Sequence, residues 1–581
     1  MAANLKLPAW AQEMHDLFKS GSVAQFIIHG NIFDVVPCAS TNGGPSRLLP
    51  LKAFLNEVMF DGYDVVLQYD RSKGVRAIKG AEDWGDWLQQ VTGTEARAIA
   101  QLPPTSMALE MIDRYLLRTL NLQALSAKET KRSTKIAVVI DFSEFVVPHG
   151  EALQLGGDFS SNVVKVLSWA NDPAILQSNI VTVLLTEGLH DLNDLIVENP
   201  HASKLRIPLP GEDEMLEFTR ILAEQKFPDL AARCDVPIEV LARRLTGLSR
   251  VGAQTVISLA LNNGRRITAD YLMRTKKDMI ERECQGLLEF LESPFTLDNV
   301  AGHEAVKAWL RDDAQLLRKM ALHALPMGYL IAGRIGTGKT FLVQCWAGEL
   351  GIPCMVFKNF RDKWVGATES NLEKIFSILR ALGQVVVFVD EADQAAGQRE
   401  GGEGDSGLSG RVYAMLAKEM SDTRNRGKIL WVFATSRPDL LEVDLKRQGR
   451  LDVHFPLFGP QTAQEMRDLL LAVAKKLKFP LQASDVPELP QDVMLGGNEV
   501  EGVLVRALRQ FELSGEPRKP LKDILGEVFR EVRPSAFTRK LEYMDLAAVK
   551  ECTDVRFLPE RFRGIGPEEL EKRLDELRRF V

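Results

Sequence analysis

The most informative segment of the sequence is Gly328-Tyr-Leu-Ile-Ala-Gly-Arg-Ile-Gly-Thr-Gly-Lys-Thr340, which continues into Phe341-Leu-Val-Gln-Cys-Trp-Ala-Gly-Glu-Leu350. Residues 328–332 form a continuous apolar run, which predicts a buried strand. Residues 341–350 follow the apolar spacing of a helix, and the glycine-rich segment 333–340 separates the two. The sequence therefore predicts a strand, a glycine loop and a helix in direct succession.

This glycine loop matches the pattern G-x-x-x-x-G-K-[ST], and the strand before it and the helix after it make the match specific. Gly333, Gly336 and Gly338 leave room for backbone N–H groups to surround phosphate oxygens, and the helix N-terminus adds a favourable field. Lys339 would reach the β- and γ-phosphates, and Thr340 would offer a hydroxyl to Mg²⁺. The alternative is a glycine turn that contains Lys-Thr by chance. The predicted ATP contacts are Gly333, Arg334, Ile335, Gly336, Thr337, Gly338, Lys339, Thr340 and Phe341.

Two further apolar strands end in polar residues. Residues 385–389 lead into Asp390 and Glu391, and residues 429–434 lead towards Ser436. Strands that alternate with helical stretches predict an α/β fold with a doubly wound parallel sheet, which binds ligands at the carboxyl ends of its strands. Because an unpaired carboxylate at the end of a buried strand is costly, we assign Asp390 to the Mg²⁺ shell and Glu391 to activation of the attacking water. The alternative role for an acid here is to cap the next helix, which suits Asp393 better than Asp390 because the glycine loop lies upstream.

The rest of the chain divides around this module. After Pro460 the apolar pattern becomes helical, with Gly496-Gly497 at the start of its second helix. The last stretch is charged and helical, with breaks at prolines and glycines. The predicted parts are an N-terminal α/β domain, a large α/β subdomain, a helical lid and a C-terminal helical extension, at residues 1–285, 286–460, 461–535 and 536–581.

The N-terminal half shows the same order of apolar strands with polar residues at their ends, but without the glycine loop. An apolar strand precedes His29-Gly30-Asn31, a second ends at Asp141, and a third ends at Thr186. No Gly-Lys-Thr or Gly-Lys-Ser occurs before residue 300. We interpret this half as a duplicated module that has lost its nucleotide site. The alternative is an unrelated α/β domain.

Composition narrows the class of protein. The chain has 581 residues, of which 45% are hydrophobic and 26% charged, as in ordinary globular proteins with several domains. The net charge of -7 argues against nucleic acid as a partner. Six cysteines without a CxxC pair fit reduced thiols, and no apolar run approaches the ~18 residues of a membrane span. We therefore expect a cytoplasmic protein without a membrane partner.

Residues 294–535 resemble a AAA+ ATPase module of the AAA subtype. The matching motifs are Phe295-Thr-Leu-Asp-Asn-Val-Ala-Gly302, the glycine loop, Lys363-Trp-Val-Gly-Ala-Thr-Glu-Ser-Asn-Leu372, Val389-Asp-Glu-Ala-Asp393, Ala434-Thr-Ser-Arg-Pro-Asp439 and Leu445-Lys-Arg-Gln-Gly-Arg-Leu-Asp452. With its N-terminal half as a degenerate AAA-like module, the chain is also similar to the Ycf46-like group. The resemblance implies a P-loop NTPase fold with a helical lid.

The resemblance also assigns roles to single residues. Ser436 stands where the family usually has an asparagine that positions the attacking water, and its shorter side chain suggests slow hydrolysis. Arg447 and Arg450 match the arginines that such proteins insert into the neighbouring subunit's site, with Gln448 replacing a proline between them. Ala301 and Gly302 match the backbone platform for adenine. An arginine that acts in trans implies a homo-oligomeric ring, and the family implies a hexamer.

Trp364 and Val365 occupy the place of the family's pore loop, which grips polypeptide. The resemblance therefore implies an ATP-hydrolysing ring protein that uses Mg²⁺ and remodels, unfolds or translocates a protein client. Two alternatives remain at this stage. Trp364 could be a core residue, and the chain could be a regulatory or scaffold switch that binds a partner according to its ATP state without threading it.

Overall fold

A computed structural model describes residues 7–38, 46–92, 103–126, 134–150, 156–358, 369–393, 406–488, 495–514, 519–532 and 538–581. Its contacts divide the chain into two compact units. The first comprises residues 1–280 and 367–381, and the second comprises residues 281–366 and 382–581.

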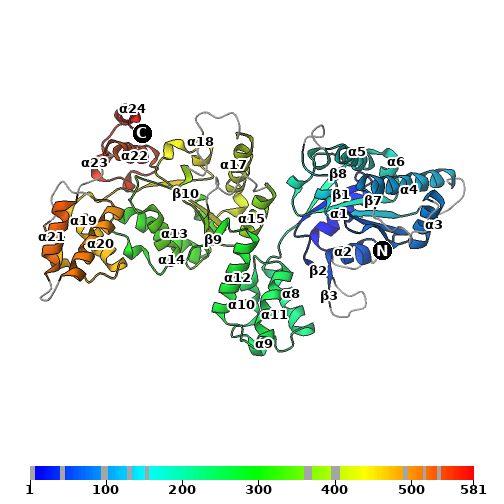
Figure 1. Ribbon diagram of the computed structural model, residues 1–581, viewed down its shortest axis with the longest axis horizontal. Coiled ribbons are helices and arrows are strands. Elements are labelled where there is room, and N and C mark those ends of the chain that lie inside the picture. Colours follow the sequence, from blue (N-terminus) through cyan, green and yellow to red (C-terminus); the bar gives the residue numbers. More distant parts are fainter. Residues whose placement is uncertain are drawn as a thin grey trace. The chain divides into compact units, whose positions relative to one another are not determined.

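The first unit is built on a mostly parallel sheet (Figure 1). Its strands are β1 (Gln25–Gly30), β4 (Val65–Asp70), β5 (Gly74–Lys79), β6 (Ile136–Ile140), β7 (Ile180–Thr186) and β8 (Ala202–Ile207), and β2 (Val35–Cys38) with β3 (Arg47–Pro50) form a separate hairpin. The order in the six-stranded sheet is β5-β4-β6-β7-β1-β8. β5 runs antiparallel to β4, and the other neighbours are parallel.

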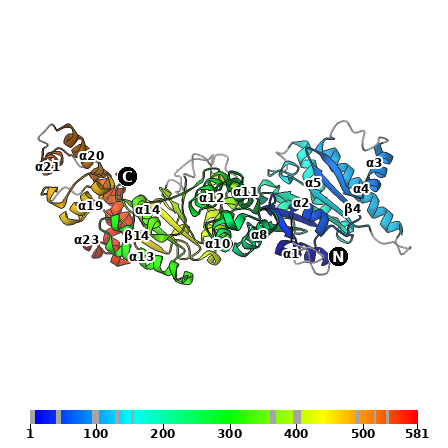
Figure 2. The ribbon, with the colours of Figure 1, turned by 90° about the horizontal axis from the view of Figure 1, so that it is seen from below.

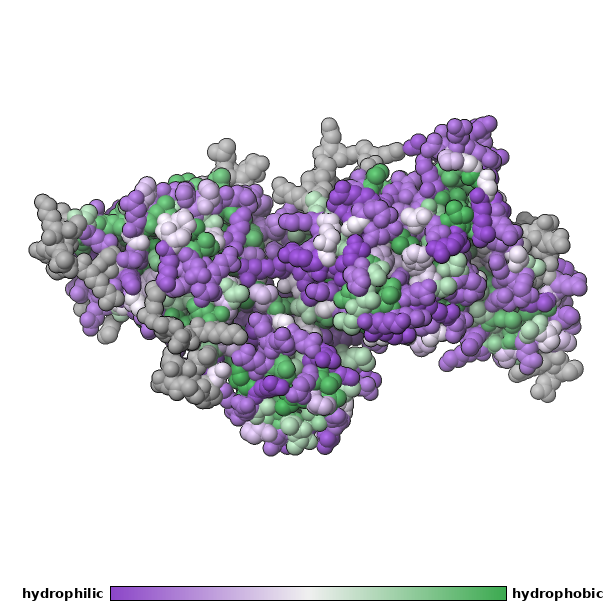
Figure 3. Space-filling view, turned by 180° about the vertical axis from the view of Figure 1, so that it is seen from behind, coloured by the Kyte–Doolittle hydropathy of each residue, from purple (hydrophilic) through white to green (hydrophobic). Residues whose placement is uncertain are grey.

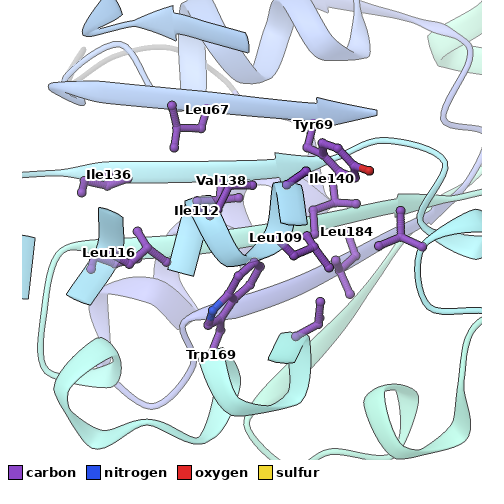
Figure 4. Packing of buried hydrophobic residues seen from close by; sticks show 14 of the residues in the cluster. Leu67, Tyr69, Leu109, Ile112, Leu116, Ile136, Val138, Ile140, Trp169 and Leu184 are labelled. Atoms are coloured by element: carbon purple, nitrogen blue, oxygen red, sulfur yellow. The ribbon is translucent and has the colours of Figure 1, made fainter. Parts of the chain in front are cut away.

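Helices cover both faces of this sheet. They are α1 (Ala9–Lys19), α2 (Leu51–Phe54), α3 (Ala81–Thr92), α4 (Thr105–Ser126), α5 (Gly157–Asn171), α6 (Pro173–Leu176) and α7 (Asp194–Val197), with the π-helical turn η1 (Leu55–Met59) after α2. On one face Val138 packs in a cluster with Ile112 of α4 and Trp169 of α5 (Figure 4). The next residue of the strand, Val139, points to the other face and packs in a cluster with Phe54 of α2. The near-continuous apolar strands are thus explained by burial on both faces.

A group of helices follows β8 in the first unit. They are α8 (Glu212–Gln225), α9 (Leu230–Arg233), α10 (Ile238–Leu245), α11 (Arg250–Asn262) and α12 (Ala269–Glu283). Ser249 caps α11, because its hydroxyl accepts the backbone N–H of Gly252 at 3.0 Å. The contacts also group α15 (Glu369–Leu382) with the first unit.

The second unit has a sheet of the same kind. Its strands are β9 (Leu288–Phe290), β10 (Gly328–Ala332), β11 (Cys354–Phe357), β12 (Val385–Val389), β13 (Ile429–Thr435) and β14 (Val453–Pro456), in the order β14-β10-β13-β12-β11-β9. β9 is antiparallel to β11, and the other neighbours are parallel. The helices between and before these strands are α13 (Glu304–Arg318), α14 (Lys339–Leu350), α17 (Ser406–Met420) and α18 (Val443–Lys446).

Two helical groups follow this second sheet (Figures 1 and 2). The lid consists of α19 (Ala463–Lys476), α20 (Gly497–Leu513) and α21 (Leu521–Glu531), which share one apolar cluster. The C-terminal helices are α22 (Thr538–Glu551), α23 (Glu560–Arg563) and α24 (Pro567–Arg578), which pack around Tyr543, Leu546 and Phe562.

The two sheets have matching strand orders. The parallel strands run β8-β1-β7-β6-β4 in the first unit and β14-β10-β13-β12-β11 in the second, and an antiparallel strand closes one edge of each. The predicted α/β fold with parallel, helix-covered sheets is therefore confirmed. All six cysteines lie in described residues and are free thiols, as expected.

Candidate active site

The glycine loop between β10 and α14 has the backbone that its sequence predicts. Gly336 and Gly338 both have φ of 83°, a left-handed conformation that favours glycine. Gly333 is required for a different reason, since a Cβ atom there would lie 2.2 Å from the carbonyl oxygen of Leu457. Lys339 is the first residue of α14, so the loop ends at a helix N-terminus.

Lys339 connects this loop to the end of β13. Its Nζ lies 2.8 Å from the carbonyl oxygen of Gly333, 3.1 Å from that of Arg334 and 3.1 Å from Oγ of Ser436. Burial lowers the pKa of Lys339 to about 8, although the carboxylate of Asp390 and other nearby acids act in the opposite direction. The structure thus brings Ser436 beside the loop, at the edge where the strands end.

The proposed metal ligands lie together at the same edge. The Thr340 hydroxyl donates to Oδ2 of Asp390 at 2.7 Å, and the Glu391 backbone N–H donates to Oδ1 at 2.9 Å. A hydroxyl and one carboxylate are a donor set that Mg²⁺ takes up together with phosphate and water oxygens. These residues therefore fit the ion that the sequence analysis assigned to them.

Glu391 has a strained backbone. Its φ of 47° is unusual for a residue with a side chain, and such strain is found at functional sites. Glu391 is exposed and lies two positions after the last residue of the buried strand β12. Two residues on, Oδ1 of Asp393 accepts the hydroxyl of Thr435 at 2.6 Å, so this acid ties the ends of β12 and β13 together.

The two candidate arginines differ in exposure. The side chain of Arg447 is 60% exposed, and its Nε lies 3.2 Å from Oδ1 of Asp444. The side chain of Arg450 is 8% exposed, and its Nη1 donates to the Asp444 carbonyl oxygen at 2.7 Å and to the Asp444 carboxylate. Arg447 is therefore free to reach outwards, whereas Arg450 is held within its own loop.

The lid contacts the glycine loop, and the predicted adenine platform lies just before α13. The backbone N–H of Gly497, the first residue of α20, donates to the carbonyl oxygen of Gly336 at 2.7 Å. Gly302 has φ of 71°, and Ala301 beside it is half-buried. The ring of Phe341 lies 5.5 Å from that of Phe295.

The remaining predicted residues divide into two groups. The side chain of Ile335 is 61% exposed at the surface of the loop. The Thr337 hydroxyl donates to the Arg334 carbonyl oxygen at 2.9 Å, a hydrogen bond within the loop. Trp364 and Val365 lie outside the described residues.

Sequence reasoning did not assign a role to Asp444 or Thr435. Asp444 contacts both candidate arginines. It lies in the short helix α18, three residues before Arg447, and this spacing alone could have predicted an ion pair between the two. Thr435 accepts the Arg437 backbone N–H at 2.9 Å and donates to Asp393. Nothing in the local sequence distinguishes such a threonine from an ordinary strand residue.

Comparison with known families agrees with this geometry. Residues 2–208 match the model for the N-terminal Rossmann-like domain of a AAA+ chaperone, and residues 216–285 match that for the second helical domain of a AAA+ chaperone. Residues 329–458, which include the loop, the acidic strand end and both arginines, match the ATPase family associated with various cellular activities. The chain belongs to the AAA+ ATPases.

Curated proteins similar to this AAA+ ATPase include the peroxisomal ATPase PEX6 of Candida glabrata, 28% identical over 49% of this chain and 30% of that protein. A cell division cycle protein 48 homolog of Archaeoglobus fulgidus is 28% identical over 58% of this chain and 48% of that protein. The ATP-dependent zinc metalloprotease FtsH 1 of Symbiobacterium thermophilum is 33% identical over 34% of this chain and 34% of that protein. The chain thus spans about half or less of the length of these relatives.

One face of this AAA+ ATPase is mainly polar (Figure 3). Figure 3 shows hydrophilic residues over most of the face it displays, with apolar residues in small separate groups. Within the described residues, no helix combines the length and the apolar character that crossing a bilayer requires.

Proposed function

We propose that the second unit binds ATP with Mg²⁺ and hydrolyses it. The observation that carries this proposal is the meeting of Lys339, Ser436, Thr340 and Asp390 at the carboxyl edge of one sheet, with Glu391 next to them. Lys339 would bind the β- and γ-phosphates, Ser436 would orient the attacking water, and Glu391 would accept its proton. Mg²⁺ held by Thr340 and Asp390 would neutralise charge on the phosphate oxygens.

We further propose that the protein acts in the cytoplasm as a homo-oligomeric ring, hexameric as in the family it resembles. Arg447 would enter the neighbouring subunit's site, and its exposed side chain supports this role. Arg450 would instead hold the loop in place through Asp444. Trp364 and Val365 would grip a protein client, which the ring would remodel, unfold or translocate.

We propose that the first unit is a degenerate AAA-like platform without nucleotide. The end of β6 supports this most directly. Asp141 follows β6 as Asp390 follows β12, and the next residue has a left-handed backbone in both places, with φ of 52° at Phe142 and 47° at Glu391. A phenyl ring has no proton acceptor, so Phe142 cannot activate water as a glutamate can.

The charges at this edge of the first unit already have protein partners. Asp141 is 2% exposed and is paired with Lys52, so a lysine ammonium lies where the second unit would bring a metal ion to Asp390. Asp34 follows β1, and its carboxylate accepts the backbone N–H groups of Arg250 and Val251 at 3.0 and 2.9 Å. A carboxylate of the chain thus occupies the helix N-terminus of α11, which would otherwise be able to bind an anion.

The alternative function is an ATP-dependent switch that binds a partner without threading it. The Ser436 hydroxyl favours this alternative, since it has one donor where an asparagine amide has two. Replacing Trp364 by alanine separates the two functions. A motor would keep its basal ATP turnover and lose processing of an unfolded test protein, whereas a switch would keep both its turnover and its partner.

Particle images of the Glu391→Gln variant with ATP test the ring proposal. The variant should retain ATP and accumulate closed rings, because binding is intact and cleavage is not. The Lys339→Ala variant, which should lose ATP, serves as the control and should form few rings. Equal populations of single subunits in both samples would contradict the proposal.

A further inference from the structure

The C-terminal helix α22 touches two loops of the candidate active site besides the glycine loop. The hydroxyl of Tyr543 donates to Oδ2 of Asp439 at 3.1 Å, and the Arg437 guanidinium lies 5.2 Å from the centroid of the Tyr543 ring. Arg437 and Asp439 lie one and three positions after Ser436 in the chain. At the other end of α22, Glu551 pairs with Lys446, which immediately precedes Arg447.

Asp545 lies between these contacts and faces the glycine loop. The residue is 5% exposed, and its Oδ2 lies 3.8 Å from Nη1 of Arg334 and 4.0 Å from Nη2 of Arg561. Its Oδ1 has no hydrogen-bond partner among the residues that the structure describes. The side chain of Arg561 is 55% exposed and that of Arg334 is 20% exposed, so Arg334 is the less exposed of the two partners of this acid.

Packing alone does not explain an acid at this position. The neighbours Leu546, Ala547 and Val549 already join α22 to the apolar cluster of the C-terminal helices. A buried carboxylate is costly unless a charge or a donor compensates it, so an apolar residue would serve packing better. The nearest compensating charge for Asp545 is Arg334 of the glycine loop, and the more exposed Arg561 adds to it.

Arg334 is well placed to transmit this contact to the nucleotide site. Its carbonyl oxygen accepts from Nζ of Lys339 at 3.1 Å and from the hydroxyl of Thr337 at 2.9 Å. A shift of Arg334 would therefore move the groups that hold the phosphate-binding lysine. The G-x-x-x-x-G-K-[ST] pattern leaves position 334 open, so the motif itself does not demand an arginine.

We propose that Asp545 is a positioning residue of the ATP site, which holds the glycine loop in its binding conformation through Arg334. This inference rests on the proposed ATPase function of the second unit. It makes the C-terminal extension part of the nucleotide-binding machinery, because one helix then contacts the glycine loop, the loop after Ser436 and the segment before Arg447.

The test compares Asp545→Asn with wild type in ATP turnover. Asparagine keeps the shape and removes the charge, so KM for ATP should rise about 10-fold while kcat changes less than about twofold. Arg334→Ala should give the same rise, and the double variant should be no worse than either single one, because all three lack the same contact. Exchanging the charges, with Arg334→Asp and Asp545→Arg, should restore part of the affinity.

The pH dependence provides a readout that a purely structural role would not move. Burial raises the pKa of Asp545 to about 6, among the charges of Arg334, Arg561, Glu542 and Lys339. Protonated aspartic acid resembles asparagine in charge, so the KM ratio of variant to wild type should fall towards one as the pH drops from about 7.5 to about 5.

Glu571→Gln is the matched control, since it breaks a surface pair of Glu571 with Lys550 of α22 and should leave KM unchanged. An Asp545→Asn variant that melts at a lower temperature but has the wild-type KM would overturn the proposal. Additive KM effects in the double variant would do the same. If Asp545→Asn does not fold, the loop variant Arg334→Ala decides alone. A wild-type chain without ATP turnover would contradict the proposed function, which is a separate result.

Discussion

Replacing Asp34 by asparagine tests the idea that the first unit carries its own anion where a nucleotide site would be. Asp34 is 3% exposed. Its carboxylate accepts the N–H groups of Arg250 and Val251, accepts from Nδ2 of Asn31 at 2.8 Å, and lies 3.6 Å from Nη1 of Arg250. Asparagine has a similar shape but presents an amide N–H₂ group in place of one oxygen and carries no charge.

The expected cost follows from these contacts. The variant loses at least one charge-assisted hydrogen bond, leaves a helix N–H group unsatisfied and leaves the Arg250 side chain, which is 9% exposed, without its buried partner. Breaking a buried pair costs about 3–5 kcal/mol, and we take the lower end because Glu214 still lies 3.3 Å from Arg250. A local loss of about 3 kcal/mol corresponds to roughly 100-fold faster opening of α11.

Amide hydrogen exchange of peptides that cover residues 250–262 measures this opening directly. Asp61→Asn is the matched control. The Asp61 side chain is 83% exposed, and its ion pair with Lys79 is long, at 3.9 Å. Such a surface pair contributes little to stability, so residues 250–262 should exchange at the wild-type rate in this variant. An Asp34→Asn variant whose α11 exchanges less than about 5-fold faster than wild type would refute the reasoning, since that limit is about 1 kcal/mol.

Three further predictions concern the second unit. Burial raises the pKa of Asp313 to about 6, above its value of about 3.9 in an unfolded chain, so the folded state binds the proton more tightly. The protein therefore loses about 3 kcal/mol of stability as the pH rises from about 3 to about 7. Urea unfolding of Asp313→Asn should lack this pH dependence, and equal slopes for the variant and the wild type would disprove the assignment. Gly333→Ala should weaken ATP binding at least about 10-fold in calorimetric titration, because its Cβ would meet Leu457, whereas Gly502→Ala, with nothing within 4 Å of its Cβ, should bind normally. Arg447→Ala should lose at least about 100-fold in turnover, and mixing it with Lys339→Ala should restore activity if the arginine acts in trans; full turnover by Arg447→Ala alone would exclude that role.

The sequence was sufficient for the features that depend on neighbouring residues. The glycine loop and the acid-ended strand 385–389 are local patterns, and parallel strands bring their carboxyl ends to one edge whatever the connecting segments are. The meeting of Thr340 with Asp390 and of Lys339 with Ser436 follows from that rule. The faint repeat in the first half was visible for the same reason, as an order of strands with polar ends.

Contacts between distant residues could not be predicted in this way. Asp34 and Arg250 are 216 positions apart, and only the folded chain shows that the Asp34 carboxylate caps the helix that begins at Arg250. The exposure of Arg447 and burial of Arg450 depend on how a short loop turns around Asp444. The left-handed backbone of Glu391 likewise has no signal in its residue type, because a glutamate ordinarily avoids that conformation.

We expect ATP to be bound and cleaved in the second unit alone. A single-turnover experiment with radiolabelled ATP on the Glu391→Gln variant tests it most directly, because it reports bound nucleotide per chain and the rate of cleavage together. The variant should retain one ATP per chain and cleave it at least about 100-fold more slowly than the wild type. Two ATP molecules per chain, or cleavage at the wild-type rate, would contradict it.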